Sequence, residues 1–548
     1  MDGGIATEKN LDLLTRKGYN YLVNGKRTSR THFYEDFVDD NSFCTITGRD
    51  NKKPVMVSRK ICGKEVIIFL KMKGRLNILG IVAGVFGTVV PLVAFADAAE
   101  SDVFAKRREW RLVGVEVPDA AMKQTMQVAD PLHGPWLTLP QPDAMSVSWI
   151  ARCACGGGVE YREKGGGDWL TAWEVKCGMI DRSKAVHTVR LTGLKPATDY
   201  EYRLVTTVDP GLQGATDYFD RERTVRTFRT VDPAKGTYRV MLMSDVHGCL
   251  NMNLDYMVDA AKADDCDCYF MLGDNVSDGV YMDIEHIITR GFLDDISRRW
   301  GSSRPTVIMR GNHDIHGRDA CKWGDYFPQP DGKTYSAFRQ GPVCFVALDT
   351  MWPKPRDRHQ TAQAAAYLAE QAEWLRGLKR AADWKSARFR IVMGHVAPWP
   401  CEADLVAPAF KDLLSDETPE GRIHAFVSGH HHAYHRFNPN TRELRFSNRY
   451  GDFTKGYPSA AIRKSVANIP ARYPYVNLIL NAHESMTLDI SPEKVLFRSH
   501  RWYKSKGGLY DAFELYPDGT VKEILDDITV LPLADISSTK TKTEKESV

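Results

Sequence analysis

The middle of the chain is built from short apolar runs that are separated by polar and glycine-containing segments. Five of these runs read YRVMLM, CYFML, TVIM, RFRIVM and HAFVS. Runs of this length, bounded by turn residues, are typical of buried β-strands. Residues 361–384 instead repeat leucine and alanine at helical spacing, at Leu368, Ala372, Leu375 and Leu378. This alternation of strands and helices predicts an α/β region.

The flanking segments have other patterns. Residues 109–230 carry short alternating runs with turn signals between them, which predicts a small antiparallel sandwich. Residues 486–490 and 494–497 also alternate, and we expect them to be late strands of a second sheet. The last segment, 534–548, is charged and poor in apolar residues, so we expect it to be disordered.

Each of the five apolar runs ends at a polar motif. The motifs are DVH at 245–247, GD at 273–274, GNHD at 311–314, GH at 394–395 and GHHH at 429–432. Strand ends in an open α/β sheet are where such folds build ligand sites. Carboxylate, imidazole and amide groups are ligands for hard to borderline divalent metals, so the sequence predicts a metal site.

Two metals about 3.5–4 Å apart can clamp a phosphoryl group and make a bound water nucleophilic near neutral pH. One short carboxylate must bridge such a pair, and Asp274 is the natural candidate. Glycines before the ligands allow the backbone to turn sharply and to approach the metals closely.

These motifs resemble the pattern DxH, GD, GNH[DE], GH and GHxH of the calcineurin-like metallophosphoesterases. The resemblance implies an α+β or α/β fold, a four-layer sandwich of two mixed β-sheets flanked by helices, with two divalent ions, Fe, Mn or Zn. It further implies that His313 stabilises the phosphate or protonates the leaving group, and that Asp314 orients His313. The implied ligands are Asp245, His247 and His432 for one metal, Asn312, His395 and His430 for the other, and Asp274 for both.

A closer resemblance is to the purple acid phosphatases. GHHHAYHR at 429–436 is similar to their GHxHAYxR, VMGH at 392–395 to their VxxH, and GPW at 134–136 to the GPY that opens their N-terminal domain. Ser277 stands where those enzymes usually have a tyrosine, and DVH stands in place of DxG. This favours Mn, Zn or Fe(II) over a ferric–tyrosinate centre.

The segment 191–203 resembles the corner motif of fibronectin type III domains. We therefore expect a fibronectin type III-like domain at 105–232 and the metallophosphoesterase domain at 237–533. The small domain either shapes the mouth of the active site or serves as a spacer or as a carbohydrate- or protein-binding module. Fold alone does not decide between these roles.

Three residues beside the motifs are candidates for substrate binding: Arg310, Tyr434 and Arg436. Arginine can fork onto phosphate oxygens. The alternative for Arg436 is a structural ion pair. His431 lies between two ligands, and strand alternation predicts that it points away from the metals.

The amino-acid composition limits the classes of partner that we expect this chain to bind. The chain has 548 residues, 43% of them hydrophobic, and 73 basic against 70 acidic residues give a net charge of +3. This balance gives no sign of a nucleic-acid-binding surface. We expect a small phosphate ester as substrate, and the sequence leaves the oligomeric state open.

From Met72 the chain reads like a secretory signal peptide over 72–96, with an apolar stretch at 76–96 and Ala94-Phe95-Ala96 as cleavage motif. Residues 1–71 are then a non-native or disordered extension, and the protein is secreted, or periplasmic and associated with the cell envelope. The alternative is an uncleaved membrane anchor, because 21 residues can cross a bilayer. N-terminal sequencing of the mature protein distinguishes the two.

Cysteine usage is less informative. Nine of the eleven cysteines follow Met72, so they cannot all pair within one chain. Cys153, Cys155 and Cys177 could supply a disulfide in an exported protein. We expect Cys266 and Cys268 to be strand residues that face opposite sides of the sheet.

Together these features predict a secreted, acid-phosphatase-like phosphomonoesterase with a dinuclear metal centre. A phosphodiesterase or nucleotide pyrophosphatase would use the same metal ligands. A non-catalytic binding protein that keeps the fold is the third possibility.

Overall fold

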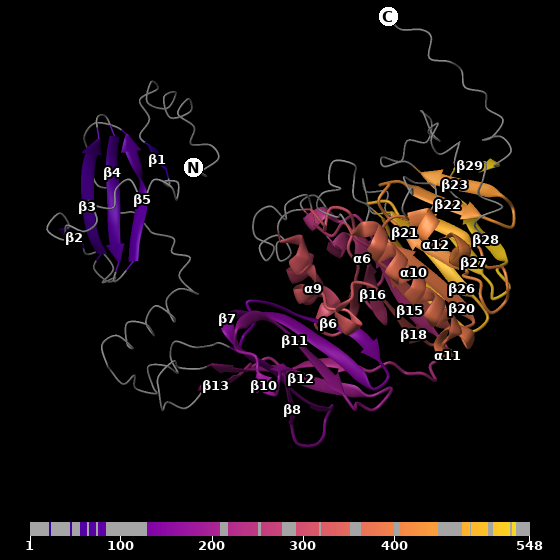
Figure 1. The fold of residues 1–548 in the computed structure, drawn as a ribbon, viewed down its shortest axis with the longest axis horizontal. Helices are drawn as coiled ribbons and strands as arrows, with labels where there is room; N and C mark the ends of the chain where they lie inside the picture. The colour runs from indigo at the N-terminus through magenta and orange to yellow at the C-terminus, as the bar shows by residue number, and fades with distance from the viewer. Residues whose placement is uncertain are drawn as a thin grey trace, which may run out of the picture. The chain divides into compact units, whose positions relative to one another are not determined.

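The computed structural model describes most of the chain after residue 128 and five strands before it. The described ranges are 21–23, 44–46, 55–62, 65–72, 75–83, 129–208, 218–249, 254–276, 292–316, 319–350, 363–398, 406–447, 474–482, 484–501, 508–526 and 529–532. The chain divides into two compact units, residues 1–98 and 99–548. Figure 1 shows the elements of each unit.

The first unit contains a five-stranded antiparallel sheet in the order β1-β5-β4-β3-β2. Its strands are β1 (Tyr21–Val23), β2 (Cys44–Ile46), β3 (Val55–Cys62), β4 (Glu65–Met72) and β5 (Arg75–Ala83). β5 therefore runs through part of the segment expected to be a signal peptide, whose cleavage motif lies outside the described residues. The signal peptide stays a prediction. Within the described part of the chain, no helix has the length and apolar character to cross a bilayer.

The second unit begins with an all-β domain, as the alternating pattern predicted. Its strands are β6 (His133–Gln141), β7 (Ala144–Glu163), β8 (Leu170–Trp173), β9 (Val175–Lys176), β10 (Met179–Ile180), β11 (Lys184–Thr192), β12 (Asp199–Val208), β13 (Tyr218–Arg221) and β14 (Arg226–Arg229). The first half of the 20-residue β7 pairs with β6 and β11, and its second half pairs with β8 and β12. Trp149 fills the core of this domain, and the Tyr200 hydroxyl accepts a hydrogen bond of 2.9 Å from the Lys195 N–H.

Two mixed sheets follow. The first has the order β17-β16-β15-β25-β26-β27-β28 and the second β18-β19-β20-β21-β24-β22-β23-β29. The first sheet comprises β15 (Tyr238–Met243), β16 (Cys268–Met271), β17 (Thr306–Ile308), β25 (Glu484–Ile490), β26 (Val495–Arg501), β27 (Gly508–Leu515) and β28 (Val521–Asp526). The second comprises β18 (Ser336–Gln340), β19 (Val343–Leu348), β20 (Phe389–Gly394), β21 (Ala425–Ser428), β22 (Tyr434–Asn438), β23 (Glu443–Ser447), β24 (Val476–Ile479) and β29 (Thr529–Pro532).

The two sheets pack face to face around one apolar core, with helices outside each sheet. Val240 and Phe270 of the first sheet share this core with Phe345 and Ile391 of the second. Outside the second sheet lie α10 (Ala364–Arg380), α11 (Ala382–Lys385) and α12 (Val406–Leu414), and outside the first lie α6 (Leu254–Ala261), α8 (Asp294–Ile296), η4 (Ser297–Gly301) and α9 (Trp323–Tyr326). The four-layer prediction is confirmed. The expected helix at 361–384 is α10 followed by α11, and Leu368 and Leu375 point into the core.

The predicted place of the late strands was wrong. Residues 486–490 and 494–497 lie in β25 and β26, and β25 pairs antiparallel with β15, with Val240 opposite Leu488. They therefore extend the first sheet and not the second. An alternating pattern identifies a strand but carries no information about the sheet that it joins.

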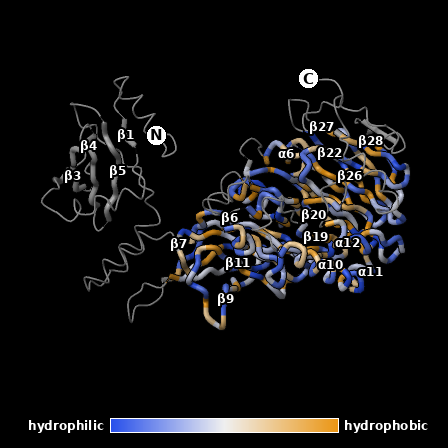
Figure 2. The backbone as a smooth tube through the Cα atoms, turned by 45° about the horizontal axis from the view of Figure 1, so that its top comes forward, coloured by the Kyte–Doolittle hydropathy of each residue, from blue (hydrophilic) through white to orange (hydrophobic). Residues whose placement is uncertain are grey.

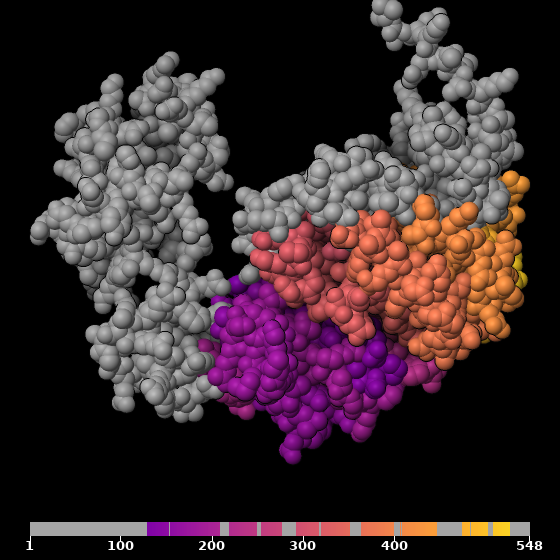
Figure 3. Space-filling model, in the orientation of Figure 1, coloured from indigo at the N-terminus to yellow at the C-terminus, as the bar shows by residue number. Residues whose placement is uncertain are grey.

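The all-β domain packs against the outer side of the first sheet. Trp136 and Ile150 belong to the same apolar cluster as residues of α6 and α9, and the Trp136 ring lies 6.2 Å from that of Phe327. The Tyr202 hydroxyl donates a hydrogen bond of 2.6 Å to the carbonyl of Ser302. Figure 3 shows the two parts in surface contact. The small domain is thus packed against the two-sheet sandwich.

The cysteines of the all-β domain do not form the expected disulfide. Neither Cys155 nor Cys177 is part of a disulfide, and the side chain of Cys153 lies outside the described residues. Cys268 is the first residue of β16 and packs between the sheets. Cys266 lies before the strand and packs against the outer helices, so the expectation that both are strand residues was wrong for Cys266.

Tyr434 and Arg436 are structural, so their predicted role in substrate binding was wrong. Both are buried in β22. The Arg436 guanidinium binds both oxygens of Asp511 in β27, at 2.7 and 2.8 Å, and Glu523 in β28 at 2.6 Å. The Tyr434 hydroxyl donates a hydrogen bond of 2.5 Å to Asp511. This network joins the two sheets, and the ion-pair alternative for Arg436 is confirmed.

Replacement of Tyr434 by Phe tests this assignment. The substitution deletes a buried hydrogen bond to a charged group, so we expect the free energy of unfolding to fall by about 1.5–3 kcal/mol. Any phosphatase KM and kcat should be unchanged, because the hydroxyl does not reach solvent. Tyr516→Phe is the matched control, since its hydroxyl bonds Glu514 at the partly exposed end of β27. A raised KM in Tyr434→Phe at unchanged stability would restore the substrate role.

Candidate metal centre

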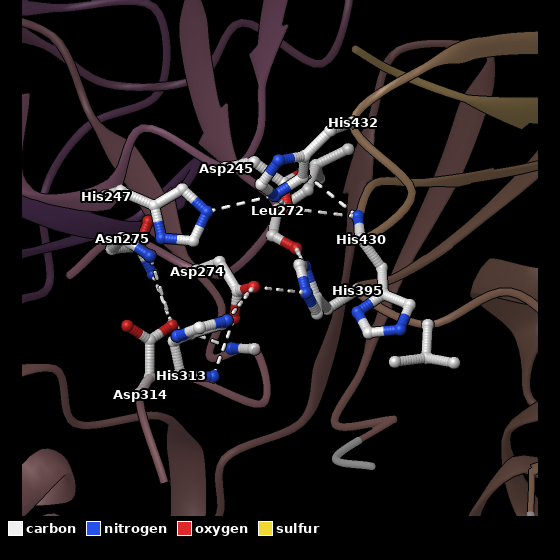
Figure 4. Close-up of polar contacts among 12 residues, drawn as sticks. Asp245, His247, Leu272, Asp274, Asn275, His313, Asp314, His395, His430 and His432 are labelled. Atoms are coloured by element: carbon white, nitrogen blue, oxygen red, sulfur yellow. Dashed lines mark hydrogen bonds and ion pairs between the residues drawn. The ribbon is translucent and has the colours of Figure 1, made fainter. Parts of the chain in front are cut away.

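The seven predicted ligands follow the carboxyl ends of five parallel strands. Asp245 and His247 follow β15, Asp274 follows β16 and Asn312 follows β17, and these three strands run parallel in the first sheet. His395 follows β20, and His430 and His432 follow β21, which runs parallel to β20 in the second sheet. Since both sheets end at the same edge of the sandwich, segments up to 187 residues apart in sequence converge there (Figure 4).

Six of the seven side chains form two overlapping groups of potential metal ligands. One group contains Asp245, His247, Asp274 and His432, and the other contains Asp274, His395 and His430. Within each group the candidate ligand atoms lie within 4.8 Å of one another. Asp274 belongs to both groups, as a bridging carboxylate must.

Individual distances show how close these groups lie. Asp274 Oδ2 is 3.1 Å from His395 Nε2, and Asp245 Oδ1 is 3.2 Å from His432 Nε2. The Nε2 atoms of His247 and His432 are only 3.0 Å apart. Two imidazole nitrogens and two carboxylates that point at one small space form a donor set typical of a divalent cation site.

Asn312 provides an independent indication of a ligand. Its side chain is fully buried, yet neither the amide oxygen nor the amide nitrogen has a hydrogen-bond partner within the described structure. Leaving a buried amide unpaired costs about 1–3 kcal/mol, so native proteins seldom do so without a reason. A cation that coordinates Oδ1 would account for it, and the residues present therefore fit a metal centre.

The backbone at the site is strained. Asp245, His247, Asp274, His430 and His432 all have positive φ, between 49° and 75°. This left-handed region is unfavourable for residues with a Cβ and costs on the order of 1–3 kcal/mol each. Five of the seven predicted ligands adopt this conformation. The fold therefore tolerates a loss of stability in order to direct these side chains toward the site.

Two glycines beside the ligands are required by close packing. A Cβ on Gly311 would lie 2.2 Å from Asp274 Oδ1, and one on Gly429 would lie 2.3 Å from Asp245 Oδ2. The expectation that glycines allow the ligand loops to approach closely is confirmed at both positions.

Two buried carboxylates dominate the electrostatics of the candidate metal centre. Burial alone would raise the pKa of Asp274, but the charge of His395 and its hydrogen bond outweigh burial and lower this pKa to about 2. For Asp245, burial is likewise outweighed by His395 and His432, and its pKa falls well below the usual range. Burial opposes the charge on His395, yet Asp274 and Asp245 together raise its pKa to about 9. Two buried anions thus face one imidazolium, a balance that favours further positive charge.

Other histidines of the site are poised as neutral ligands. Burial, aided by the charge of His395, lowers the pKa of His430 to about 3, and burial also lowers the pKa of His247. The His395 Nδ1–H donates a hydrogen bond of 3.0 Å to the Leu272 carbonyl, which directs Nε2 toward Asp274. Neutral imidazoles with a free nitrogen are the form that binds metals.

His313 lies at the edge of the ligand cluster. The backbone N–H of His313 donates a hydrogen bond of 2.8 Å to Asp274 Oδ1, and the imidazole Nε2 is 3.8 Å from Asp274 Oδ2. The ring meets His247 edge-on, at a centroid distance of 4.9 Å. With 19% of its side chain exposed, His313 combines contact with the ligands and access to solvent.

Asp314 has a different role from the predicted one of orienting His313. The buried carboxylate accepts hydrogen bonds from the N–H groups of Gly311, Asn275 and Val276 and from the Asn275 amide, at 2.7–3.2 Å. It therefore ties the loop that carries Asn312 to the loop that carries Asp274. Burial and the nearby charge of Asp274 raise its pKa to about 7.

Two residues that hold the site were missed in the sequence. Asn275 joins Asp314 and the Met309 carbonyl, the latter at 2.6 Å. Asp349 is buried after β19 and binds Arg310 Nε at 2.5 Å, so the predicted substrate residue Arg310 is anchored by an ion pair. The signal for Asp349 was present, because it ends an apolar strand in the same way as the ligands do.

Two further predictions can be placed. His431 is outside both ligand groups, and its ring lies 5.5 Å from that of His430 and 5.8 Å from that of buried His435. Its orientation away from the metals stays a prediction. Ser277, which decides the question of a tyrosinate ligand, lies outside the described residues.

Comparison with known families agrees with this geometry. Residues 238–434 match the calcineurin-like phosphoesterase model, and residues 133–230 match that of the purple acid phosphatase N-terminal domain. The chain carries a calcineurin-like phosphoesterase domain behind a purple acid phosphatase N-terminal domain. The metallophosphoesterase match spans every predicted ligand from Asp245 to His432.

Solved structures with similar folds were also found. PhoD is 12% identical with a TM-score of 0.48, covering 73% of this chain and 93% of its own. The purple acid phosphatase PPD1 from seeds of yellow lupin (Lupinus luteus) is 12% identical with a TM-score of 0.49, covering 94% of this chain and 87% of its own. The search of curated protein sequences found no match to this chain.

Removal of the bridging carboxylate tests the metal centre. Asp274→Ala deletes a residue shared by both groups, so we expect the purified protein to lose the metal that the wild type binds, as measured by elemental analysis. His395→Ala, which removes a member of one group, should lose at least part of it. The far-ultraviolet circular dichroism should stay native in both. Glu373→Ala removes an exposed carboxylate of α10 and is the control. Full metal content in Asp274→Ala would contradict the assignment.

Proposed function

We propose that the chain is a dinuclear metal-dependent phosphoric ester hydrolase, and specifically an exported phosphomonoesterase of the acid-phosphatase type. The observation that supports it most is the convergence of six carboxylate and imidazole side chains, with Asp274 shared between two groups. The buried Asn312 amide, which has no hydrogen-bond partner among the described residues, adds to it. Export rests on the apolar segment 76–96 alone.

The metal-binding roles divide between the two groups. Asp245, His247 and His432 would hold one divalent cation, Asn312, His395 and His430 the other, and Asp274 both. When bound, two such cations would neutralise phosphate charge and activate water at neutral pH. The identity of the metals, Fe, Mn or Zn, is open, since these residue types accept all three.

His313 is proposed to act on the leaving group. It touches the bridging carboxylate and also reaches solvent, so a phosphate ester at the metals would lie within its reach. A histidine there can donate a hydrogen bond to the phosphate or a proton to the departing oxygen. Asp314 would act indirectly, by fixing the loops of Asp274 and Asn312.

His313→Ala separates chemistry from metal binding. No metal ligand is removed, so metal content should stay at the wild-type value. Loss of general acid catalysis should lower kcat by about 10²–10⁴-fold. The deficit should shrink for esters with a good leaving group, such as p-nitrophenyl phosphate, compared with alkyl phosphates. An equal deficit for both kinds of ester would argue against protonation of the leaving group.

A substrate panel tests the proposed activity itself. p-Nitrophenyl phosphate, bis-p-nitrophenyl phosphate and nucleotides would be assayed with Mn, Zn and Fe. The proposal expects the highest kcat/KM for the monoester. Preference for the diester or for nucleotides would favour the alternative phosphodiesterase or pyrophosphatase, which needs the same ligands. Metal binding without hydrolysis of any ester would indicate a binding protein.

A further inference from the structure

A second group of reactive side chains lies in the all-β domain. It consists of Cys155 in β7, His187 in β11 and Glu174 between β8 and β9, and we call these three residues the thiol row. The Cys155 sulfur is 3.5 Å from His187 Nε2, and His187 Nδ1 is 2.8 Å from Glu174 Oε2. A nucleophile within reach of a base, with the base held by a third group, is the arrangement that activates nucleophiles in enzymes.

The imidazole of this row is fixed in one orientation. The Trp149 ring packs on it at a centroid distance of 5.1 Å. On another side lies the backbone of Gly157, where a Cβ would come within 2.4 Å of the ring. Because Nδ1 faces the Glu174 carboxylate, the favoured tautomer carries its proton there and turns the Nε2 lone pair toward the thiol.

We propose that Cys155, His187 and Glu174 form a thiol site that reacts with small hydroperoxides, separate from the metal centre. His187 accepts the thiol proton, and the Glu174 carboxylate stabilises the resulting imidazolium. The product is a Cys155 thiolate, which is the nucleophilic form of cysteine.

The reaction balances without a further reagent. The Cys155 thiolate attacks one peroxide oxygen, a sulfur–oxygen bond forms and the oxygen–oxygen bond breaks. The imidazolium of His187 gives its proton to the leaving oxygen. Sulfur is oxidised to sulfenic acid, and the hydroperoxide is reduced to an alcohol, or to water when it is hydrogen peroxide.

Access to the sulfur is controlled by the β9–β10 hairpin. Cys155 is only 1% exposed. The Ile180 side chain packs on the strand beside it, where a Cβ on Gly156 would lie 2.5 Å from Ile180 Cγ2. Val175 and Met179 of the same hairpin are 55% and 72% exposed, and Figure 2 shows the segment labelled β9 projecting from the domain. Such a weakly packed hairpin can open locally without unfolding the domain.

Opening need not dismantle the row. The Glu174 N–H donates to the Gly157 carbonyl at 3.0 Å, so Glu174 stays attached to β7 while the residues beyond it lift. The sandwich core around Trp149 is untouched by that movement. A small peroxide could then reach a thiol that still has its base.

Other buried cysteines provide a contrast within the same chain. Burial raises the pKa of the Cys344 thiol to about 12 and raises that of Cys268 well above its usual range. We expect such thiols to be unreactive in the folded protein. Cys177, at the exposed tip of the hairpin, shows no contact with an imidazole among the described residues and serves as the reference for an accessible thiol.

The test measures oxidation of each cysteine in the full-length protein. The protein would be treated with hydrogen peroxide, sulfenic acids trapped with dimedone, and each site quantified by peptide mass spectrometry between pH 6 and 8. We expect Cys155 to react at least about tenfold faster than Cys344, and its rate to fall less than that of Cys177 toward pH 6, because its proton is held by His187.

Two variants separate activation from loosening of the hairpin. Glu174→Gln keeps a hydrogen-bond acceptor but removes the charge that stabilises the imidazolium, so the rate at Cys155 should fall about tenfold while Cys177 is unchanged. Lys184→Gln removes the exposed partner of Glu174, which lies 2.6 Å from it, and should leave the rate near wild type. Thermal unfolding would confirm that both variants are folded.

Two results would overturn the proposal. One is modification of Cys155 only in parallel with Cys344, which would mean that the thiol reacts through global unfolding. The other is an equal change in Glu174→Gln and Lys184→Gln, which would mean that the carboxylate only holds the hairpin.

Discussion

The burial of two carboxylates at the junction of two sheets is the constraint on which the site depends. Asp245 and Asp274 are buried yet remain in their charged form. The positive charges that lower the pKa of each carboxyl group belong to histidines. Burying an anion is costly unless it is paired. The protein meets this cost by placing both anions among imidazoles, where a bound cation could neutralise them further. The strained backbone belongs to the same site, and so does the Asn312 amide, which has no hydrogen-bond partner among the described residues.

The rest of the sandwich holds that point in place. The sheets supply five strand ends at one edge, and the loops beyond them are locked by groups that need not touch a metal. Asp314 is the clearest case, because it gathers N–H groups from the loops of both Asp274 and Asn312. Arg436 has a similar structural role farther from the site. Its ion pairs with Asp511 and Glu523 join the two sheets, and the ligands converge only where these sheets meet. Precision at the metals therefore rests on buried polar networks behind them.

The ligand set could be predicted from the sequence because each ligand directly follows an apolar run. The local order of strand, glycine and polar residue carries both the fold and the chemistry. Asp349 obeys the same rule and could have been found with it.

The fate of Tyr434 and Arg436 could not be predicted in this way. They follow the last ligand by two and four residues, and sequence proximity suggested the pocket. Their true partner is Asp511, 75 residues beyond Arg436, and it becomes a neighbour only when β22 and β27 face each other in the folded sandwich. The sheet joined by β25 and β26 was mistaken for the same reason, since a strand's neighbour is set by long-range pairing. The expected disulfide likewise required a distance that spacing does not give.

The candidate metal centre and the thiol row each contain a buried imidazole whose two nitrogens face different groups. At the centre, His395 Nδ1 faces a neutral carbonyl, that of Leu272, and Nε2 is aimed at a carboxylate beside which a cation can bind. In the all-β domain, His187 Nδ1 faces the Glu174 carboxylate, and Nε2 is aimed at a thiol. A carbonyl partner fixes the ring without favouring its protonated form as strongly, which suits a ligand. A carboxylate partner stabilises the imidazolium, which suits a base. The two histidines thus differ in which nitrogen the carboxylate faces: it is Nε2 in His395, whose pKa Asp274 and Asp245 raise to about 9, and Nδ1 in His187.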